Sequence, residues 1–486
     1  MPSTPGRLPD AQGGSNRGFL SEGSMLPFGP RMTSIRFPSD FAWGAAAASY
    51  QIEGAARDDG KGPSTWDMFC RKPGAVWQGQ NGDVACDHYH RYREDVALMK
   101  QLGLKAYRLS ISWPRVLPAG VGAVNEAGLA FYDRLVDELL AAGITPWVTL
   151  FHWDFPLELY YRGGWLNRDS AEWFAEYADL VARRLSDRVR HFMTLNEPQV
   201  FIGAGHDEGR HAPGDRLAFA EVLRAGHHAL LAHGRAVQAL RAAARQPLRI
   251  GMAPVGLTSL PATSAEADVT AARARTHSVW ARTVWVNTWW MDPVFLGRYP
   301  DDGLALFGAD APKVASGDLE IIAQPLDFFG VNLYQGTRVR AGASGAEIVP
   351  PEVGSPITAF EWDVTPEVTY WGPRFFWERY RKPIVITENG ISCRDWVARD
   401  GKVHDPDRID FTARHLIELG RAIADGVPVE GYFHWSFIDN FEWAHGYKHR
   451  FGLVFCDYAT QRRIPKDSAY WYAKVIATNG ASLLDV

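Results

Sequence analysis

HFMTLNEP, residues 191–198, is a short apolar run that ends in polar residues, Asn196 and Glu197 among them. Seven further β-rich runs recur between about Arg36 and the C-terminus, and segments with helical periodicity separate them. These runs are FAWGAAAASYQ (41–51), AYRLSISW (106–113), TPWVTLFHW (145–153), RIGMAPVG (249–256), DFFGVNLY (327–334), PIVITEN (383–389) and VEGYFHWS (429–436). Strands that alternate with helices form βα units around a parallel sheet. The pattern therefore predicts an α/β fold, a (β/α)8 TIM barrel.

Two of the intervening segments show the helical pattern clearly. In 126–142, apolar residues fall on one face of a helix with 3.6 residues per turn, and Gly143 follows as a helix stop. In 170–185 the same periodicity recurs, with Ser170 as the expected N-cap. Both segments are predicted to be outer helices of the barrel.

The domain organisation follows from the connections. Segments 257–326 and 335–382 are too long for bare loops, so we expect extra helices or hairpins within them. No change of composition resembles an interdomain linker, and residues 34–486 are predicted to form one barrel domain with elaborated loops. Residues 1–33 are rich in Gly, Pro and Ser and are predicted to be a disordered leader.

The composition argues against several classes of protein. The 486-residue chain has a formal net charge of -5 that is spread along its length, which indicates no nucleic-acid surface and no membrane-binding helix. No apolar run is long enough to span a membrane, so a cytoplasmic location is expected. The four cysteines and the pairs His88/His90 and His206/His211 lack metal-ligand spacing, so we expect neither a metal nor another cofactor.

Polar and ionisable residues gather at the C-terminal ends of the predicted strands. They are Gln51, Arg108, His152, Asn196, Glu197, Asn332, Tyr334, Glu388 and Trp435. In a TIM barrel these ends converge on the face that carries the active site. Aromatic residues make up 13% of the chain, and sugar rings stack on aromatic side chains. The sequence therefore predicts a carbohydrate site at this face, although most of the aromatic residues must belong to the core.

Two of these residues are glutamates, Glu197 in TLNEP and Glu388 in ITENG, and each has an asparagine beside it. Two carboxyl groups that flank the anomeric carbon are what cleavage of a glycosidic bond requires. A single glutamate before Pro or Gly is more often a helix cap or one half of an ion pair. Because both lie at strand ends of one barrel, they are predicted to form the catalytic pair.

Several longer strings closely resemble glycoside hydrolase family 1, which contains the β-glucosidases. They are SYQIEGA (49–55), YRLSISWPRVLP (107–118), FHWDFP (151–156), TLNEP (194–198), NLY (332–334), ITENG (386–390) and NFEWAHGYKHRFGLV (440–454). The resemblance extends from about Phe37 to the C-terminus. It implies a retaining β-glycosidase of the β-glucosidase type, which hydrolyses terminal non-reducing β-D-glucosyl residues through a glycosyl-enzyme intermediate.

The resemblance also implies roles for individual residues. Glu388 matches the nucleophile and Glu197 the general acid/base. Arg108 and Tyr334 match positions beside the nucleophile, where a cation and a hydrogen-bond donor keep a carboxylate ionised. Asn196 resembles the residue that holds the sugar 2-OH.

Further residues are expected to bind the two parts of the substrate, a small-molecule β-glucoside or a cello-oligosaccharide. Those expected around the non-reducing-end sugar are Gln51, His152, Asn332, Trp435, Glu442 and Trp443. Trp362 and Gln199 are expected at the entrance for the aglycone, and Gln199 stands where many relatives carry an aromatic residue. The preferred sugar and the existence of a homo-oligomer are left open.

Two alternative functions lie within the same scaffold. A 6-phospho-β-glycosidase would need cationic groups where this chain has Glu442, whose charge would repel a phosphate. A non-catalytic sugar-binding relative would be expected to lack one of the two carboxyl groups, and this chain keeps Glu197 and Glu388.

Overall fold

The computed structural model describes residues 35–485, so the predicted leader 1–33 lies outside the described residues. All the predicted barrel strands are present and form one parallel sheet in the order β5-β4-β3-β2-β1-β11-β10-β7. The strands are β1 (Ala42–Ala46), β2 (Ala106–Ser110), β3 (Thr145–Phe151), β4 (His191–Asn196), β5 (Arg249–Ala253), β7 (Phe329–Asn332), β10 (Ile384–Asn389) and β11 (Val429–Trp435). The predicted TIM barrel is therefore confirmed.

The two edge strands of this sheet meet and close the barrel. Val255, just after β5, forms a parallel bridge with Asn332 at the end of β7. The N–H of Gly256 donates to the carbonyl of Asn332 over 2.9 Å, and the N–H of Asp327 donates to the carbonyl of Ile250 over 2.8 Å. Closure places the C-terminal ends of the strands around a single mouth.

Inward-pointing side chains from different strands fill the barrel. Large residues (Trp147, Phe328 and Phe433) pack with small ones (Ala46, Ala106 and Ala253), and all of them are at least 97% buried. The small residues leave room for the large rings in a close-packed interior. This also explains the alanine-rich first strand, which lies in the middle of the sheet between β2 and β11.

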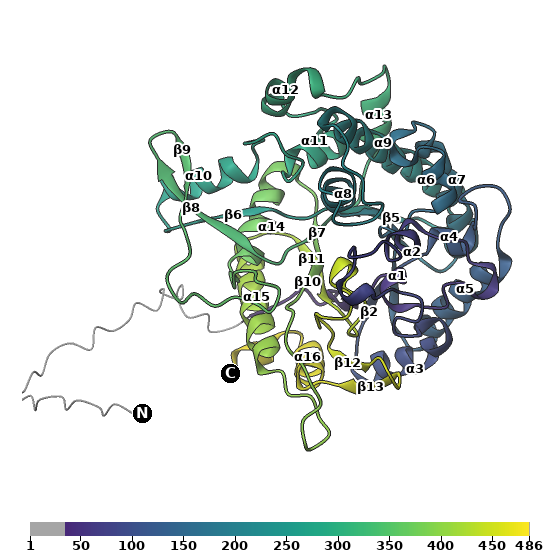
Figure 1. Ribbon diagram of the computed structural model, residues 1–486. Coiled ribbons are helices and arrows are strands. Elements are labelled where there is room, and N and C mark those ends of the chain that lie inside the picture. The colour runs from purple at the N-terminus through teal and green to yellow at the C-terminus, as the bar shows by residue number, and fades with distance from the viewer. Residues whose placement is uncertain (1–34, 486) are drawn as a thin grey trace, which may run out of the picture. The chain divides into compact units, whose positions relative to one another are not determined.

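Helices surround the strands, as Figure 1 shows. The longer ones are α3 (His88–Gln101), α5 (Glu126–Ala141), α7 (Ser170–Leu185), α9 (Phe219–Ala243), α14 (Val368–Tyr380), α15 (Pro406–Ala424) and α16 (Asp467–Ala477). α5 buries the predicted apolar face, and Gly143 follows it with a φ of 77°. A positive φ costs glycine little, which is why the helix stops there.

The two long connections carry the extra elements expected of them. Between β5 and β7 lie β6 (Thr258–Pro261), α10 (Glu266–Thr276), α11 (Thr288–Leu296), α12 (Asp301–Phe307) and α13 (Asp318–Ile322). Between β7 and β10 lies a hairpin of β8 (Gly336–Gly342) and β9 (Gly345–Ile348), which joins β6 in a separate sheet. Figure 1 shows this sheet beside α10, outside the ring of barrel strands. A second hairpin, β12 (Val454–Asp457) and β13 (Arg462–Pro465), precedes α16.

Two local expectations were wrong. Ser170 is not the N-cap of α7 but its first residue, because Asn167 already makes the preceding turn by accepting from the N–H of Asp169 over 2.9 Å. Gln51 does not end the first strand, because β1 stops at Ala46 and Gln51 lies in the short helix α1 (Ser49–Ile52). No helix among residues 35–485 is long and apolar enough to cross a membrane, and the cytoplasmic location stays a prediction.

Candidate active site

A pocket of about 370 Å³ opens at the C-terminal ends of the barrel strands. The residues that line its inner part include His152, Trp153, Glu197, Asn332, Tyr334, Glu388, Trp435, Glu442 and Trp443. Most of them lie at the end of, or just after, β3, β4, β7, β10 or β11, so the predicted convergence of strand ends brings them together. Glu197 and Glu388 line the same pocket although 191 positions separate them in the sequence (388 − 197).

Glu388 is the more firmly held of the two carboxyl groups. It lies near the end of β10 and is 4% exposed. The guanidinium of Arg108, from β2, bonds to its Oε1, and the hydroxyl of Tyr334 donates to its Oε2 over 2.8 Å. The pKa of Glu388 is raised by burial, and Arg108, Tyr334 and Asn332 limit that rise. A cation and a phenol on a buried carboxyl group favour its ionised form.

Glu197 lies at the turn between β4 and the short helix α8 (Pro198–Ile202). Its backbone has φ 48° and ψ 67°, a left-handed conformation that is uncommon for a residue other than glycine. The N–H of Glu197 donates to the carbonyl of Ala253 over 2.8 Å, and the amide of Asn332 donates to its Oε1 over 2.7 Å. Burial, and next the negative charge of Glu388, raise the pKa of Glu197 to about 8.

Asn196 and Asn332 connect the two carboxyl groups. The Oδ1 of Asn196 accepts from Arg108 Nη2 over 2.6 Å and from Asn332 Nδ2 over 3.1 Å. The Oδ1 of Asn332 in turn accepts from Thr387, the neighbour of Glu388, over 2.6 Å. All of these groups are buried, so the network fixes the positions of both carboxyl groups before any substrate binds.

His152 continues this network toward the pocket. Its Nε2 accepts from Asn196 Nδ2 over 3.0 Å. Burial, and next the charge of Arg108, lower the pKa of His152 well below its ordinary value, so the ring is neutral. A neutral ring that accepts at Nε2 carries its proton on Nδ1. That nitrogen is buried and has no partner among the described residues, and the His152 side chain belongs to the pocket lining.

Aromatic rings form the wall around His152. Trp435 and Trp443 both lie nearly parallel to its ring, at centroid distances of 5.8 Å and 6.0 Å. Trp153 contacts Trp443 at 4.5 Å and donates from its indole to the carbonyl of Asn196 over 2.9 Å. Stacked apolar faces beside convergent polar groups suit the two kinds of surface on a sugar ring.

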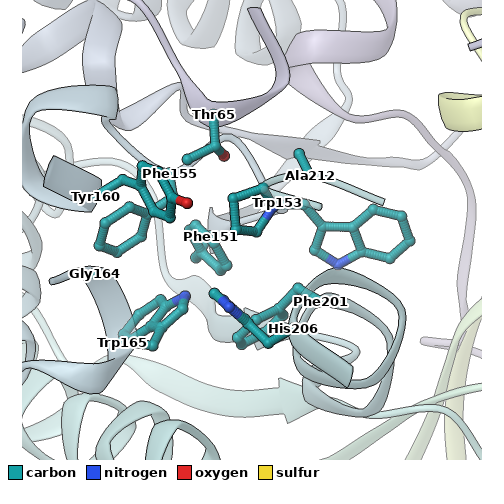
Figure 2. A pocket seen from close by; sticks show the side chains of 11 residues that line it. Thr65, Phe151, Trp153, Phe155, Tyr160, Gly164, Trp165, Phe201, His206 and Ala212 are labelled. Atoms are coloured by element: carbon teal, nitrogen blue, oxygen red, sulfur yellow. The ribbon is translucent and has the colours of Figure 1, made fainter. Parts of the chain in front are cut away.

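A small cavity lies behind Trp153, as Figure 2 shows. Its volume is about 10 Å³, and Phe151, Phe155, Trp165 and Phe201 surround it. These rings also contact one another, for example Phe151 and Phe201 at 5.0 Å. The cavity is too small for a ligand. The packed aromatic side chains around it support the pocket wall from behind.

Glu442 lines the sugar end of the pocket, whereas Gln51, which was also expected there, does not line it and bonds to the loop that carries Glu442. Gln51 Nε2 donates to Asn440 Oδ1 over 3.0 Å and to the carbonyl of Phe441 over 2.8 Å, while its Oε1 has no partner among the described residues. Glu442 lines the pocket, and its Oε2 also lacks a partner there. Burial, and next the charge of Glu388, raise the pKa of Glu442 to about 8. Of these two side chains, Glu442 is the one that brings a polar atom without a protein partner to the pocket lining.

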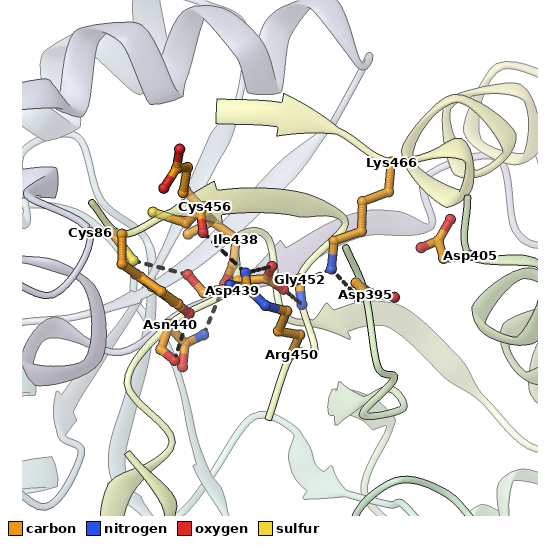
Figure 3. Close-up of polar contacts among 12 residues, drawn as sticks. Cys86, Asp395, Asp405, Ile438, Asp439, Asn440, Arg450, Gly452, Cys456 and Lys466 are labelled. Atoms are coloured by element: carbon orange, nitrogen blue, oxygen red, sulfur yellow. Dashed lines mark hydrogen bonds and ion pairs between the residues drawn. The ribbon is translucent and has the colours of Figure 1, made fainter. Parts of the chain in front are cut away.

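A buried network of charges supports the loop that carries Asn440 and Glu442 (Figure 3). Asp439, which is fully buried, pairs with Arg450 over 2.6 Å and with Lys466 over 2.7 Å. Lys466 also pairs with Asp395, over 2.5 Å. Each charge has an opposite partner, as burial requires. The network ties the loop after β11 to the start of α16 and so holds the sugar end in place.

At the entrance, one of the two expected residues lines the pocket. Trp362 does so and packs against Tyr334 and Phe360. Gln199 does not, because its side chain is fully buried and bonds to the backbone of Val255. Its side chain donates to the carbonyl of Val255 over 3.0 Å and accepts from the N–H of the same residue over 3.3 Å. Gln199 therefore links α8 to the end of β5.

Other entrance residues were not predicted from the sequence. Arg210, His211, Trp285 and His445 line this part of the pocket. These four residues lie in long loops and not at strand ends, so the strand pattern of the sequence could not predict that they line the pocket. Among residues 35–485, no group of three or more His, Cys, Asp or Glu side chains is arranged to hold a metal ion.

Comparison with known proteins agrees with this geometry. The model of the family described as glycosyl hydrolase family 1 matches residues 33–481. Beta-glucosidase A of Thermotoga maritima is 45% identical over 451 residues, which are 92% of this chain and 99% of that protein. A bifunctional beta-D-glucosidase/beta-D-fucosidase of Bifidobacterium breve is 40% identical over 480 residues, 93% of this chain and 100% of that protein.

A solved structure is similar over the same length. The β-glucosidase from Thermotoga maritima in complex with glucoimidazole has a TM-score of 0.84 at 44% identity, and the match covers 92% of this chain and 99% of that one. The family model and these relatives span nearly the whole of the described barrel. The chain therefore belongs to glycosyl hydrolase family 1.

Proposed function

We propose that this chain is a retaining β-glucosidase, with Glu388 as the nucleophile and Glu197 as the general acid/base. The observation that supports it best is the unequal environment of the two carboxyl groups. Glu388 contacts a guanidinium and a phenol, whereas the pKa of Glu197 is raised to about 8. A pair with one ionised and one protonated carboxyl group is what the first step of glycoside hydrolysis needs.

In the first step, Glu197 gives its proton to the glycosidic oxygen while Glu388 attacks the anomeric carbon from the other face. The bond from that carbon to the leaving group breaks, the alcohol departs, and an ester forms between the sugar and Glu388. Asn196, held between Arg108 and Asn332, would bind the sugar 2-OH, a contact that strengthens in the transition state.

In the second step, the charge that helped to raise the pKa of Glu197 is gone, because Glu388 is now esterified. Burial remains, so only the part of the rise that Glu388 caused is lost. Glu197 then takes a proton from water, the water oxygen attacks the anomeric carbon, and the ester bond to Glu388 breaks. The product keeps the β configuration.

The sugar end of the pocket suits a neutral hexose. Gln51, His152 and Glu442 each have a polar atom without a protein partner among the described residues, and Trp435 supplies a flat apolar surface. The relatives named above carry the names β-glucosidase and β-D-glucosidase/β-D-fucosidase. We infer terminal β-D-glucosyl residues of small β-glucosides or cello-oligosaccharides as substrates. A 6-phosphate is disfavoured because, among the described residues, no lysine or arginine lines the sugar end to pair with it.

The test is the configuration of the first product. Hydrolysis of 4-nitrophenyl β-D-glucoside is followed by proton NMR from the first turnovers, before mutarotation mixes the anomers. The β anomer is expected first. An α-glucose signal that appears first would contradict retention, and no turnover of any aryl β-glycoside would contradict the enzymatic assignment altogether.

A further inference from the structure

The entrance of the pocket carries a cation that the proposed chemistry does not use. Among the described residues that line the pocket, Arg210 is the one lysine or arginine. It follows α8 and its π-helical extension η4 (Gly203–Asp207), on a different loop from Trp362. The other residues at this end are mainly aromatic or aliphatic: Val200, Leu257, Trp285, Phe360, Trp362 and Phe451. A positive charge among apolar walls marks a place where a ligand with both characters would bind.

Arg210 is held in a defined orientation. Glu208 accepts from the indole N–H of Trp285 over 2.7 Å with Oε1, and its Oε2 bonds to Nε of Arg210. The guanidinium also lies over the ring of Trp285, 5.5 Å from its centroid. Glu208 therefore uses both oxygens to fix the cation against the indole. A fixed side chain loses less conformational entropy when a ligand binds.

The remaining edge of the guanidinium is available. The Nε atom of Arg210 is engaged, but neither terminal nitrogen makes a hydrogen bond with another described residue, and the side chain is 52% exposed. Two parallel N–H groups on one edge match the two oxygens of a carboxylate. A lysine would offer the charge without this paired geometry.

The charges along the pocket strengthen the argument. At the inner end, the carboxylate of Glu388 would repel an anionic leaving group. At the outer end, the histidines are neutral, because burial lowers the pKa of His211 to about 3 and also lowers the pKa of His445. Arg210 is thus the lining group that can offset the charge of such a leaving group.

We propose that the entrance binds an aromatic leaving group that carries a carboxylate, and that Arg210 recognises the carboxylate. The aromatic ring would lie among Trp362, Phe360 and Trp285, and the carboxylate would bond to the terminal nitrogens of Arg210. This proposal rests on the proposed β-glucosidase activity, and it names a substrate class for that activity. Arg210 is a specificity-determining residue in this account.

The experiment compares 4-carboxyphenyl β-D-glucoside with its uncharged amide, 4-carbamoylphenyl β-D-glucoside. The measured quantity is the ratio of kcat/KM for the acid to kcat/KM for the amide, in which differences in folded fraction cancel. The ratio is measured for the wild type, Arg210→Gln, Arg210→Lys and the control Arg183→Gln. Arg183 is an exposed residue of α7 that is also paired with a carboxylate, Asp179, and it does not line the pocket.

We expect Arg210→Gln to lower the ratio about three- to tenfold, the range for a partly exposed charge pair with good geometry. In Arg210→Lys the ratio should fall less than in Arg210→Gln, and in Arg183→Gln it should equal the wild-type ratio. About 0.5 M salt should lower the ratio of the wild type. An unchanged ratio in Arg210→Gln would overturn the proposal. A greater loss of cellobiose hydrolysis than of acid hydrolysis in that variant would also overturn it, by making Arg210 a ligand of sugar hydroxyls.

The two proposals fail in different ways. If the wild type hydrolyses neither aryl glucoside, the β-glucosidase activity is wrong. If it hydrolyses both and the ratio does not depend on Arg210, the activity stands and the role of Arg210 is refuted.

Discussion

The hydroxyl of Tyr334 donates a hydrogen bond to Oε2 of Glu388 over 2.8 Å, and Arg108 occupies the other oxygen of the same carboxyl group. Tyr334 is partly buried and packs against Trp362 and Phe451, which hold its ring in place. This contact distinguishes Glu388 from Glu197, whose hydrogen-bond donor is the uncharged amide of Asn332. The assignment of nucleophile and acid depends on that difference.

Replacement of Tyr334 by phenylalanine removes a donor that favours the ionised form of Glu388. The pKa of Glu388 should rise, so the acid limb of the kcat/KM profile should move to higher pH. We expect kcat to fall about 10- to 100-fold, as for loss of one preorganised donor. The control is Tyr432→Phe in β11. This buried tyrosine donates to Oδ1 of Asn389 over a distance of 2.8 Å, and it does not line the pocket. An acid limb that stays in place in Tyr334→Phe would contradict the role given to this hydrogen bond.

The raised pKa of Glu197 predicts the basic limb of activity. Because this group must be protonated to act as the acid, kcat/KM for 4-nitrophenyl β-D-glucoside should fall as the pH rises through about 8. In Glu197→Gln, 2,4-dinitrophenyl β-D-glucoside should still give a burst of dinitrophenolate, since this leaving group needs no proton. The rate of this burst, normalised by its amplitude, should not fall as the pH rises through about 8. If the limb persists in the Gln variant, another group causes it.

Glu442 should lower the stability of the fold at alkaline pH. Its folded pKa, about 8, lies above the ordinary value of 4.5, so the native state holds a proton that the unfolded state has lost between these pH values. The contribution of Glu442 to the free energy of unfolding is fully present below about pH 4.5, and it is lost as the pH rises toward 8. Glu442→Gln should therefore raise the apparent Tm by about 1–2 °C at pH 9 and change it little at pH 4.5. An exposed control, Glu266→Gln on α10, should show no such difference.

A gain of the same size at both pH values would mean that the side chain packs better as an amide, without any titration. A loss at pH 9 would contradict the assignment of a raised pKa to Glu442. Differential scanning calorimetry of both variants beside the wild type decides between these outcomes.

Gln199 should matter for stability but not for the choice of aglycone. Gln199→Ala removes both hydrogen bonds to Val255 and leaves these partly buried backbone groups without their side-chain partner, which should cost about 1–3 kcal/mol of unfolding free energy. The ratio of kcat/KM for cellobiose to that for 4-nitrophenyl β-D-glucoside should stay the same. Trp362→Ala, a change in the pocket lining, should alter this ratio. A changed ratio in Gln199→Ala would restore this residue to the aglycone site.

The sequence was sufficient to predict the barrel, because strand and helix periods alternate clearly and most of the barrel strands, though not β1 and β5, end in a polar residue or are followed directly by one. Glu197, Glu388 and Asn332 could be predicted for the same reason, since a closed barrel brings strand ends together wherever they lie in the sequence. Gln51 was placed in the wrong element, because the alanines and the serine of 45–49 give no signal of where β1 ends, and its role in sugar binding stays a prediction.

Sequence patterns did not predict the features that depend on packing between long loops. Gln199 looked like an entrance residue because of its position after Glu197, and only the three-dimensional course of α8 turns it toward Val255. Arg210 and Trp285 lie in loops that carry no strand-end signal, and Glu208 brings them together through tertiary contacts. Strand periodicity fixes the barrel and its mouth, but it does not specify what the loops place around that mouth.

The central claim is that Glu388 is the nucleophile, and azide rescue tests it most directly. Glu388→Gly should lose hydrolysis of 2,4-dinitrophenyl β-D-glucoside and leave a space on the α face of the anomeric carbon. Azide added to the variant should enter that space, restore release of dinitrophenolate and give α-D-glucosyl azide, which proton NMR identifies by its anomeric coupling. Rescue that gives the β-azide, or a glycine variant that hydrolyses the substrate as fast as the wild type, would contradict the assignment of Glu388.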